Sequence, residues 1–360
     1  MKHRSEETDN RTRSRPQGLT LTVGPGGDLE GNDDRILQAG IDYLARLGGP
    51  GVLQILPGDY QMANSLYLRG GITLRGTAHE TTLHKPPSHS TPITRESDWY
   101  ENRVTVEDPA GFRPGGGIML RAYTDTGALR DVVRDTIVAI EGHEIFLSRR
   151  PEKNFWGIDH ATAASLYPLL TACEGVHDVV VEDLILDGHR SDNEEINGNY
   201  SGAVFLQQCH RYLFRRVTAR DYHGDGFSFQ ICDDIRFENC QSLGNANLGF
   251  HPGSGSQRPV FRDCVGDGTV RGFSSAGVSP MAESRVVNSA TTQTTGCRLG
   301  IETLTTAYVE QISQETTRQD CASASHYTAI AVVIETPSNS ADLLTMASPK
   351  TVSPSMSAVL

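Results

Sequence analysis

Val181-Glu-Asp-Leu184 is the first of four segments in this chain that share one pattern, two polar residues between two apolar ones. The others start 33, 23 and 24 residues further along in turn: Phe214-Arg-Arg-Val217, Phe237-Glu-Asn-Cys240 and Phe261-Arg-Asp-Cys264. A second pattern, glycine followed by alternating apolar residues, recurs at a similar period in Gly202–Leu206, Gly226–Phe229 and Gly249–His251. Short apolar segments at a fixed period are typical of solenoids, whose turns pack only against their neighbours. We therefore predict an all-β solenoid, a single-stranded parallel β-helix.

The N-terminal part predicts a helix followed by the first turns of the coil. Gly31-Asn-Asp-Asp34 offers an Asx N-cap, the apolar residues from Ile36 to Leu47 follow helical spacing, and Gly48-Gly49 ends the run. Strand-like segments then follow at Val52–Leu56, Ser65–Leu68 and Ile72–Leu74. An amphipathic helix can cover the apolar core that the end of a solenoid exposes. We expect this helix to cap the coil.

Two segments carry a resemblance to a known family. Residues Gly48 to Tyr60 resemble the N-terminal part of the pectin-lyase-like superfamily, where a capping helix leads into a first turn with the pattern Leu-Pro-Gly-Asp-Tyr. Residues Gly249 to Val260 are similar to a segment of bacterial, pectate-lyase-like right-handed β-helix repeat proteins. The resemblance implies a right-handed coil and action on an extended carbohydrate. The sequence lacks the Asn-Thr-Asp and Gly-His-Gly signatures of polygalacturonases and the Asp-Pro-His signature of mannuronan epimerases.

Three segments depart from the repeat. Residues 1–17 are charged and lack an apolar period, which predicts disorder. Residues 104–150 contain strand-like runs without the repeat, and we expect them to form a β insertion in a coil that spans 18–272. Residues 273–360 are off-pattern and rich in Ser and Thr. This last segment is either a disordered tail or the product of a frameshift after about residue 272.

The frameshift hypothesis follows from the codons of this tail. We read new codons from the third base of one codon and the first two bases of the next. Residues 272–281 can then encode Phe-Phe-Phe-Cys-Trp-Gly-Val-Ser-His-Gly, which is similar to a turn of the same β-helix group. Residues 293–306 can encode Ser-Ile-Gly-His-Arg-Asp-Thr-Asp-Asn within a similar turn. A coil without its last turns exposes apolar core and a sheet edge, so we expect poor solubility or a frayed C-terminal half.

Composition restricts the class of partner and the location. The net charge of −12 and the pI near 5.4 argue against nucleic acid and against anionic membrane surfaces. The sequence contains no apolar run of about 18 residues, the length of a membrane span, and Met1–Gln17 lacks the apolar region of a signal peptide. We expect a protein that is monomeric if the coil is fully capped. Its location would be cytoplasmic as written, or extracytoplasmic if the true start lies upstream.

The repeat also predicts a site, because neighbouring coils stack about 4.8 Å apart. Alignment of the turns places Asp187 beside Arg220, and Arg190 near His223. The same alignment turns Phe205 inward with Phe229, and turns His251 outward onto a solvent face. The predicted groove is lined by Asp187, His189, Arg190, Arg220, Asp221, His223, Asp225 and His251.

Several functions fit this groove. A lyase acting on uronic acids needs a base for the C5 proton and a cation near the carboxylate, for which Arg, His or carboxylate-bound Ca²⁺ could serve. A glycoside hydrolase needs two carboxylates, such as Asp187 with Asp221 or Asp225. The aspartates could equally be ordinary turn residues. The alternative from another class is a non-catalytic β-helix that binds a glycan or a protein, or an inactive truncated product.

Overall fold

The structure, a computed structural model, describes residues 18–267 in full. Beyond them it describes only the backbone of the strand segments 271–273, 284–290, 299–301, 312–314 and 329–331. The predictions for residues 1–17 and for the reading frame after residue 272 lie outside the part described in full.

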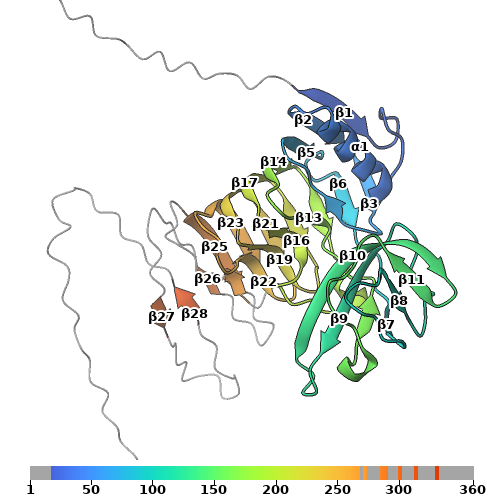
Figure 1. The fold of residues 1–360 in the computed structure, drawn as a ribbon. Coiled ribbons are helices and arrows are strands. Elements are labelled where there is room, and N and C mark those ends of the chain that lie inside the picture. Colours follow the sequence, from blue (N-terminus) through green and yellow to red (C-terminus); the bar gives the residue numbers. More distant parts are fainter. Residues whose placement is uncertain are drawn as a thin grey trace, which may run out of the picture.

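The chain winds repeatedly through three parallel β-sheets (Figure 1). The first sheet contains β1 (Leu19–Val23), β2 (Gly51–Ile55), β5 (Ile72–Arg75), β14 (His177–Glu182), β17 (His210–Arg215), β20 (Asp233–Glu238) and the start of β23 (Val260–Asp267). The second contains β3 (Gly58–Gln61), β6 (Thr81–His84), β15 (Ile185–Asp187), β18 (Thr218–Arg220), β21 (Gln241–Leu243) and the end of β23. The third contains β4 (Leu66–Tyr67), β13 (Leu170–Ala172), β16 (Gly202–Gln207), β19 (Asp225–Gln230), β22 (Leu248–Pro252) and β24 (Arg271–Phe273). The predicted all-β class with parallel sheets is confirmed, and the closed solenoid remains a prediction.

Further strands follow β24. Strand β25 (Ser284–Ala290) pairs in parallel with β23 and antiparallel with β26 (Leu299–Ile301). Strands β27 (Ile312–Gln314) and β28 (Ala329–Ala331) form an antiparallel pair. The backbone therefore adds one more parallel strand to the first and second sheets after β23.

Aromatic stacks form the centre of the coil. The rings of Phe214, Phe237 and Phe261 come from successive turns and stack with centroids 5.0 and 5.1 Å apart. Phe227 and Phe250 stack in the same way on the third sheet, at 5.0 Å, and meet the first stack edge to face. Offset stacks and edge-to-face pairs are the arrangements that aromatic rings prefer. One repeated apolar position thus becomes a continuous core.

The register corrects one predicted column. Gly202 lies opposite Asp225, so Phe205 is paired with Ser228 and Leu206 with Phe229. Side chains alternate between the two faces of a strand, so this one-residue difference moves Phe205 from the predicted inner face to the outer face. The prediction that Phe205 points inward with Phe229 is therefore wrong. The ring is nevertheless buried, and the guanidinium of Arg134 lies over it, 4.1 Å from the ring centroid.

Helix α1 (Asp34–Arg46) lies at the N-terminal end of the coil (Figure 1). The carboxylate of Asp33 accepts hydrogen bonds from the backbone N–H groups of Arg35 and Ile36, which makes it an N-cap. One face of the helix buries Leu37, Ile41 and Leu44 in the main core. The role of the helix as a cap on the coil remains a prediction.

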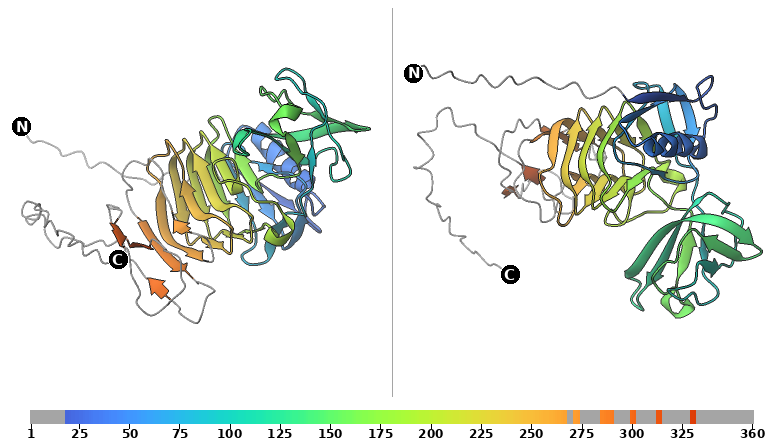
Figure 2. Two further views of the ribbon diagram at one scale, coloured as in Figure 1. Left: turned by 90° about the horizontal axis from the view of Figure 1, so that it is seen from below. Right: turned by 45° about the horizontal axis from the view of Figure 1, so that its top comes forward.

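A separate antiparallel sheet leaves the coil after β6 and returns before β13. It contains β7 (Ser90–Pro92), β8 (Arg103–Thr105), β9 (Gly117–Tyr123), β10 (Leu129–Glu141), β11 (Glu144–Leu147) and β12 (Thr162–Ala164). The sheet has its own apolar core and lies beside the N-terminal end of the coil (Figure 2). Its strands extend from Ser90 to Ala164, beyond both ends of the segment 104–150.

No helix in the described part of the chain combines the length and the apolar character needed to cross a membrane.

Candidate functional site

The candidate site lies where the strands of the second sheet end. His84, Asp187 and Arg220 are the last residues of β6, β15 and β18, and the parallel register places them side by side. Arg220 donates to one oxygen of Asp187, Oδ2, from Nε at 2.8 Å and from a terminal guanidinium nitrogen at 2.7 Å. The register therefore places Asp187 beside Arg220, as predicted. His84 lies on the other side of Asp187, on the preceding coil.

A tight turn brings His189 back to this edge. The backbone N–H of His189 donates to Asp187 Oδ1 at 3.2 Å, and His189 adopts a left-handed conformation with φ of 45°. Gly188 is required between them, because a Cβ atom there would lie 2.4 Å from the Cα of Tyr222 on the next coil. The turn therefore directs the imidazole of His189 toward the preceding coil.

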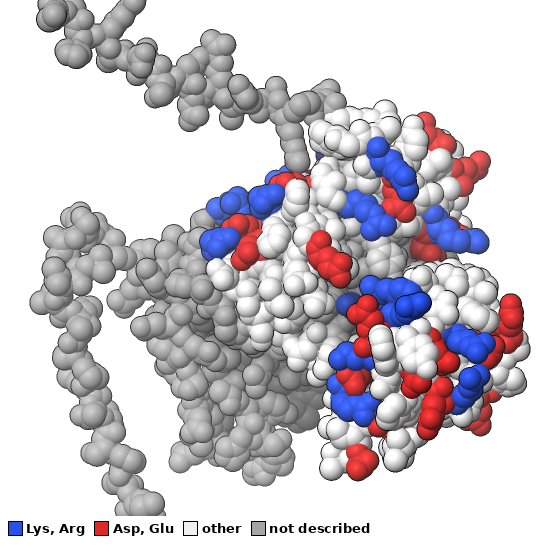
Figure 3. Space-filling view, in the orientation of Figure 1, with Lys and Arg blue, Asp and Glu red and all other residues white. Residues whose placement is uncertain are grey.

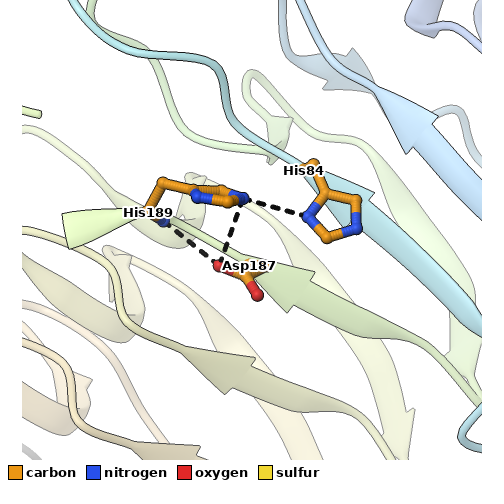
Figure 4. A group of neighbouring side chains, drawn as sticks. All are labelled: His84, Asp187 and His189. Carbon is orange, nitrogen blue, oxygen red and sulfur yellow. Dashed lines mark hydrogen bonds and ion pairs between the residues drawn. The ribbon is translucent and has the colours of Figure 1, made fainter. Parts of the chain in front are cut away.

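The two imidazoles face each other (Figure 4). Nδ1 of His84 lies 3.1 Å from Nε2 of His189, and the other nitrogen of His84 lies 2.7 Å from Asp59 Oδ1. Asp187 Oδ1 lies 3.8 Å from His189 Nε2. The side chains of His189 and Asp59 are 45% and 75% exposed, while those of His84 and Asp187 are mostly covered. The three residues His84, Asp187 and His189 are called the His–Asp cluster below.

An open pocket of about 330 Å³ borders this cluster. Its lining is formed by Asp59, Gln61, His84, Lys85, Pro86, Pro87 and His189. Lys85 is almost fully buried, and its ammonium group donates to the carbonyl of Ser165 at 3.2 Å and lies 4.3 Å from the ring centroid of Tyr167. Because burial disfavours the charged form, it lowers the pKa of Lys85 to about 7. The pocket thus offers carboxylate and imidazole groups, whereas the ammonium group of Lys85 is buried beneath it.

Three of the predicted groove residues lie elsewhere on the same corner. Arg190 is exposed and donates to the carbonyl of Gly244 at 3.3 Å. Asp221 is exposed, with a left-handed φ of 48°, directly after the strand that ends in Arg220. His223 is half-buried, with Nδ1 2.5 Å from the carbonyl oxygen of Asn193. Among these three, Arg190 and Asp221 offer exposed charges, whereas the imidazole of His223 is held by the backbone.

Asp225 and His251 form a second group, on the third sheet. His251 Nδ1 lies 2.6 Å from Asp225 Oδ2, and both residues are buried. The prediction that His251 lies on a solvent face is wrong. The loop around Gly198 covers this part of the sheet, since its carbonyl accepts from the hydroxyl of Ser228, the neighbour of His251. A buried carboxylate–imidazole pair of this kind is a structural contact as it stands.

The sequence reasoning missed Asp59, His84 and Lys85. The alignment of turns started at Val181, whereas Asp59 lies in β3, His84 ends β6 and Lys85 directly follows it, all before the antiparallel sheet. The missing signal was the order of residues at the strand ends. Leu83-His84 repeats the apolar-then-polar order of Leu186-Asp187 and Ala219-Arg220.

Positive and negative side chains are intermixed on the described surface in the view of Figure 3. Lys and Arg side chains alternate there with Asp and Glu side chains, without a broad area of one sign. An anionic ligand would therefore be held by individual cations rather than by a broad positive field.

The sequence matches no family model, and no curated protein matches it. Solved structures similar to the chain include the A-module of the mannuronan C-5 epimerase AlgE4 of Azotobacter vinelandii (16% identity, 72% of this chain and 52% of that one, TM-score 0.41). They also include the catalytic domain of a GH87 α-1,3-glucanase in complex with nigerose (10% identity, 75% and 34%, TM-score 0.40) and the tailspike gp49 of Pseudomonas phage LKA1 (16% identity, 64% and 44%, TM-score 0.24). The chain spans about half the length of the epimerase module. Its own strands pair in parallel from turn to turn, as in a parallel β-helix.

Proposed function

We propose that this protein is a lyase that acts on an extended acidic polysaccharide. The glycan would bind along the edge where the strands of the second sheet end. The observation that carries the proposal is the open pocket where Asp59, His84, Lys85 and His189 converge from neighbouring coils. Arg190 extends the same edge with an exposed guanidinium group. Long glycans need an open surface of this kind rather than a closed cavity.

The chemistry of a uronate elimination fits the groups at this edge. A base removes the proton from C5, a double bond forms between C4 and C5, and the bond from C4 to the glycosidic oxygen breaks as that oxygen takes a proton. Positive or hydrogen-bond-donating groups near the carboxylate stabilise the charge that develops in the transition state. Arg190 and the imidazole of His84 are candidates for that task. His189, whose side chain is 45% exposed at the pocket, is the candidate for the proton transfer.

A glycoside hydrolase is the second candidate, because two carboxylates lie on either side of His84. Asp59 is largely exposed and Asp187 is mostly covered. Asp187 is held in place by two contacts from Arg220 to its Oδ2 atom, which would orient it as a nucleophile or a base. Asp59 would then be the acid.

The test is turnover by the full chain on polymers of galacturonate, mannuronate and guluronate, with a neutral glucan as control substrate. We expect ultraviolet absorbance from an unsaturated uronate, in step with new reducing ends. His189→Ala should lower kcat/KM by about 100-fold or more, because it removes the proposed base. Arg216→Ala is the matched control, since Arg216 pairs with Asp183 away from the pocket.

Two outcomes would overturn the lyase. Reducing ends without ultraviolet absorbance would make the protein a hydrolase. Binding of a glycan by the parent protein without either product would make it a non-catalytic binder.

A further inference from the structure

The His–Asp cluster has the composition of a metal site. One ligand atom each of His84, Asp187 and His189 lies within 4.8 Å of the other two (Figure 4). Two imidazole nitrogens and one carboxylate oxygen are donors that divalent transition metals accept. We propose that these three groups bind one divalent transition-metal ion.

The hydrogen bonds of His84 leave the correct nitrogen available. Its Nε2 lies 2.7 Å from Asp59 Oδ1, and an ionised carboxylate only accepts, so this nitrogen carries the proton. In a neutral imidazole the other nitrogen, Nδ1, then has a free lone pair. That lone pair faces His189 Nε2. Histidines that bind metals commonly donate their second N–H to a carboxylate in this way.

The spacing of the two imidazole nitrogens fits one ion. With metal–nitrogen bonds of about 2.05 Å, two ligands lie roughly 2.9 Å apart at octahedral angles and roughly 3.3 Å apart at tetrahedral angles. The observed distance between His84 Nδ1 and His189 Nε2 is 3.1 Å, which falls between these values. No large movement of either ring is needed to place an ion between them.

Asp187 is already oriented as the third ligand. Arg220 occupies its Oδ2 atom, so Oδ1 is the oxygen turned toward the imidazoles. The distance of 3.8 Å from Oδ1 to His189 Nε2 is longer than the spacing of two ligands on one ion. His189 is the residue that would close this gap, because its side chain is 45% exposed. Asp59 and Asp187 together carry two negative charges against the single positive charge of Arg220, which favours a cation.

The donor set selects among ions. Ca²⁺ prefers six to eight oxygen ligands, so two imidazoles disfavour the Ca²⁺ that the sequence suggested. Zn²⁺ and related ions bind imidazole well, and three protein ligands leave a position for water or for a substrate oxygen. The open pocket borders the cluster, so that position faces solvent. The site thus has the open form typical of catalytic rather than structural metal centres.

Ion binding does not depend on the proposed function, because it is measured without a glycan. If both proposals hold, the ion would place positive charge beside a uronate carboxylate. Coordination would occupy the lone pair of His189, so turnover is measured both with and without the ion.

The experiment uses the full chain, purified without a histidine tag and treated with a chelator. Co²⁺ is titrated by visible absorbance, and Zn²⁺ by calorimetry. We expect one bound ion per chain, with binding weakened at least 100-fold in His84→Ala and in His189→Ala. Asp59→Asn should weaken it by about 10- to 100-fold, because Asp59 only orients His84. His210→Ala is the matched control, since His210 is also partly exposed and pairs with Asp233 on the first sheet.

Two results would overturn the inference. One is an absence of Co²⁺ and Zn²⁺ binding by the parent protein. The other is equal binding by His84→Ala and His210→Ala, which would assign the ion to scattered surface histidines. Far-ultraviolet circular dichroism of each variant excludes loss of folding as the cause. Asp59→Asn provides a further check, because that side chain is mostly exposed and its change leaves the core intact.

Discussion

Near the ends of their strands, the first and second sheets each carry a column of side chains in register. The two columns differ in whether their charged groups pair with one another. In the first sheet the register aligns Gln54, Arg75, Glu182, Arg215, Glu238 and Arg262. In the second it aligns Gln61, His84, Asp187, Arg220, Leu243 and Asp267. The first column alternates in charge, and each carboxylate lies between two guanidinium groups. The second has a histidine and a leucine where that alternation would require an arginine and an acid.

The two columns therefore differ in how many acceptor atoms remain available to a ligand. Glu182 accepts from Arg75 at 2.5 Å and from Arg215 at 3.5 Å, so both of its oxygens are used within the column. One oxygen of Asp187 accepts from Arg220, and the other faces the imidazoles of the His–Asp cluster. A column that neutralises itself contributes to stability. A column with free lone pairs can bind a ligand.

The largest expected effect on stability comes from breaking the first column. Glu182→Gln leaves the guanidinium groups of Arg75 and Arg215 without their shared carboxylate. Because Glu182 is buried, we expect a loss of about 2 kcal/mol in the free energy of unfolding. Urea denaturation measures it. Turnover and metal binding of this variant should stay at the parent's level. An unchanged denaturation midpoint would mean that the first column adds nothing to stability.

Lys85, beside the second column, gives the next effect, and its sign depends on pH. Folding lowers its pKa from 10.5 to about 7, so between these values the unfolded chain holds a proton that the folded chain lacks. The free energy of unfolding should therefore rise with pH across this window, by about 2 kcal/mol from pH 7 to pH 9. Lys85→Met should remove that rise. Parallel denaturation curves of the parent and the variant at both pH values test this, and equal slopes would contradict it.

The smallest effect should come from converting the second column into a copy of the first. His84→Arg would place Asp187 between two guanidinium groups, as Glu182 is. Since such pairs at a surface contribute little, we expect the free energy of unfolding to change by less than about 1 kcal/mol. Metal binding should be lost, because a guanidinium group has no lone pair to offer. Retained binding of Zn²⁺ by this variant would show that the two columns do not differ as described.

The repeat predicted most of the coil and one pair of the site. The apolar positions recur once per turn, so the stack of Phe214, Phe237 and Phe261 and the contact of Asp187 with Arg220 follow from counting residues. The orientation of Phe205 could not be predicted by counting residues, because a shift of one residue in the glycine pattern turned its side chain to the other face of the strand.

Two other features of the site depend on distant parts of the chain. His251 is buried because of contacts made by the loop around Gly198, which the repeat does not describe. The partner of His189 is His84, which lies 105 residues earlier in the sequence, before the segment that forms the antiparallel sheet. Local patterns carry no information on a contact of that range.

The antiparallel sheet also has an evolutionary and practical consequence, because its first and last strands are neighbours. Strand β7 pairs directly with β12, Thr162 lying opposite Pro92, so the path out of the coil and the path back run side by side. Lys85 and Ser165 join the two paths at their base. Segments whose two ends meet can be gained or lost by a chain without disturbing its host, as inserted domains are. The segment after Pro87 and before Ser165 is thus a module that could be exchanged for another, with the residues that line the neighbouring pocket kept in place.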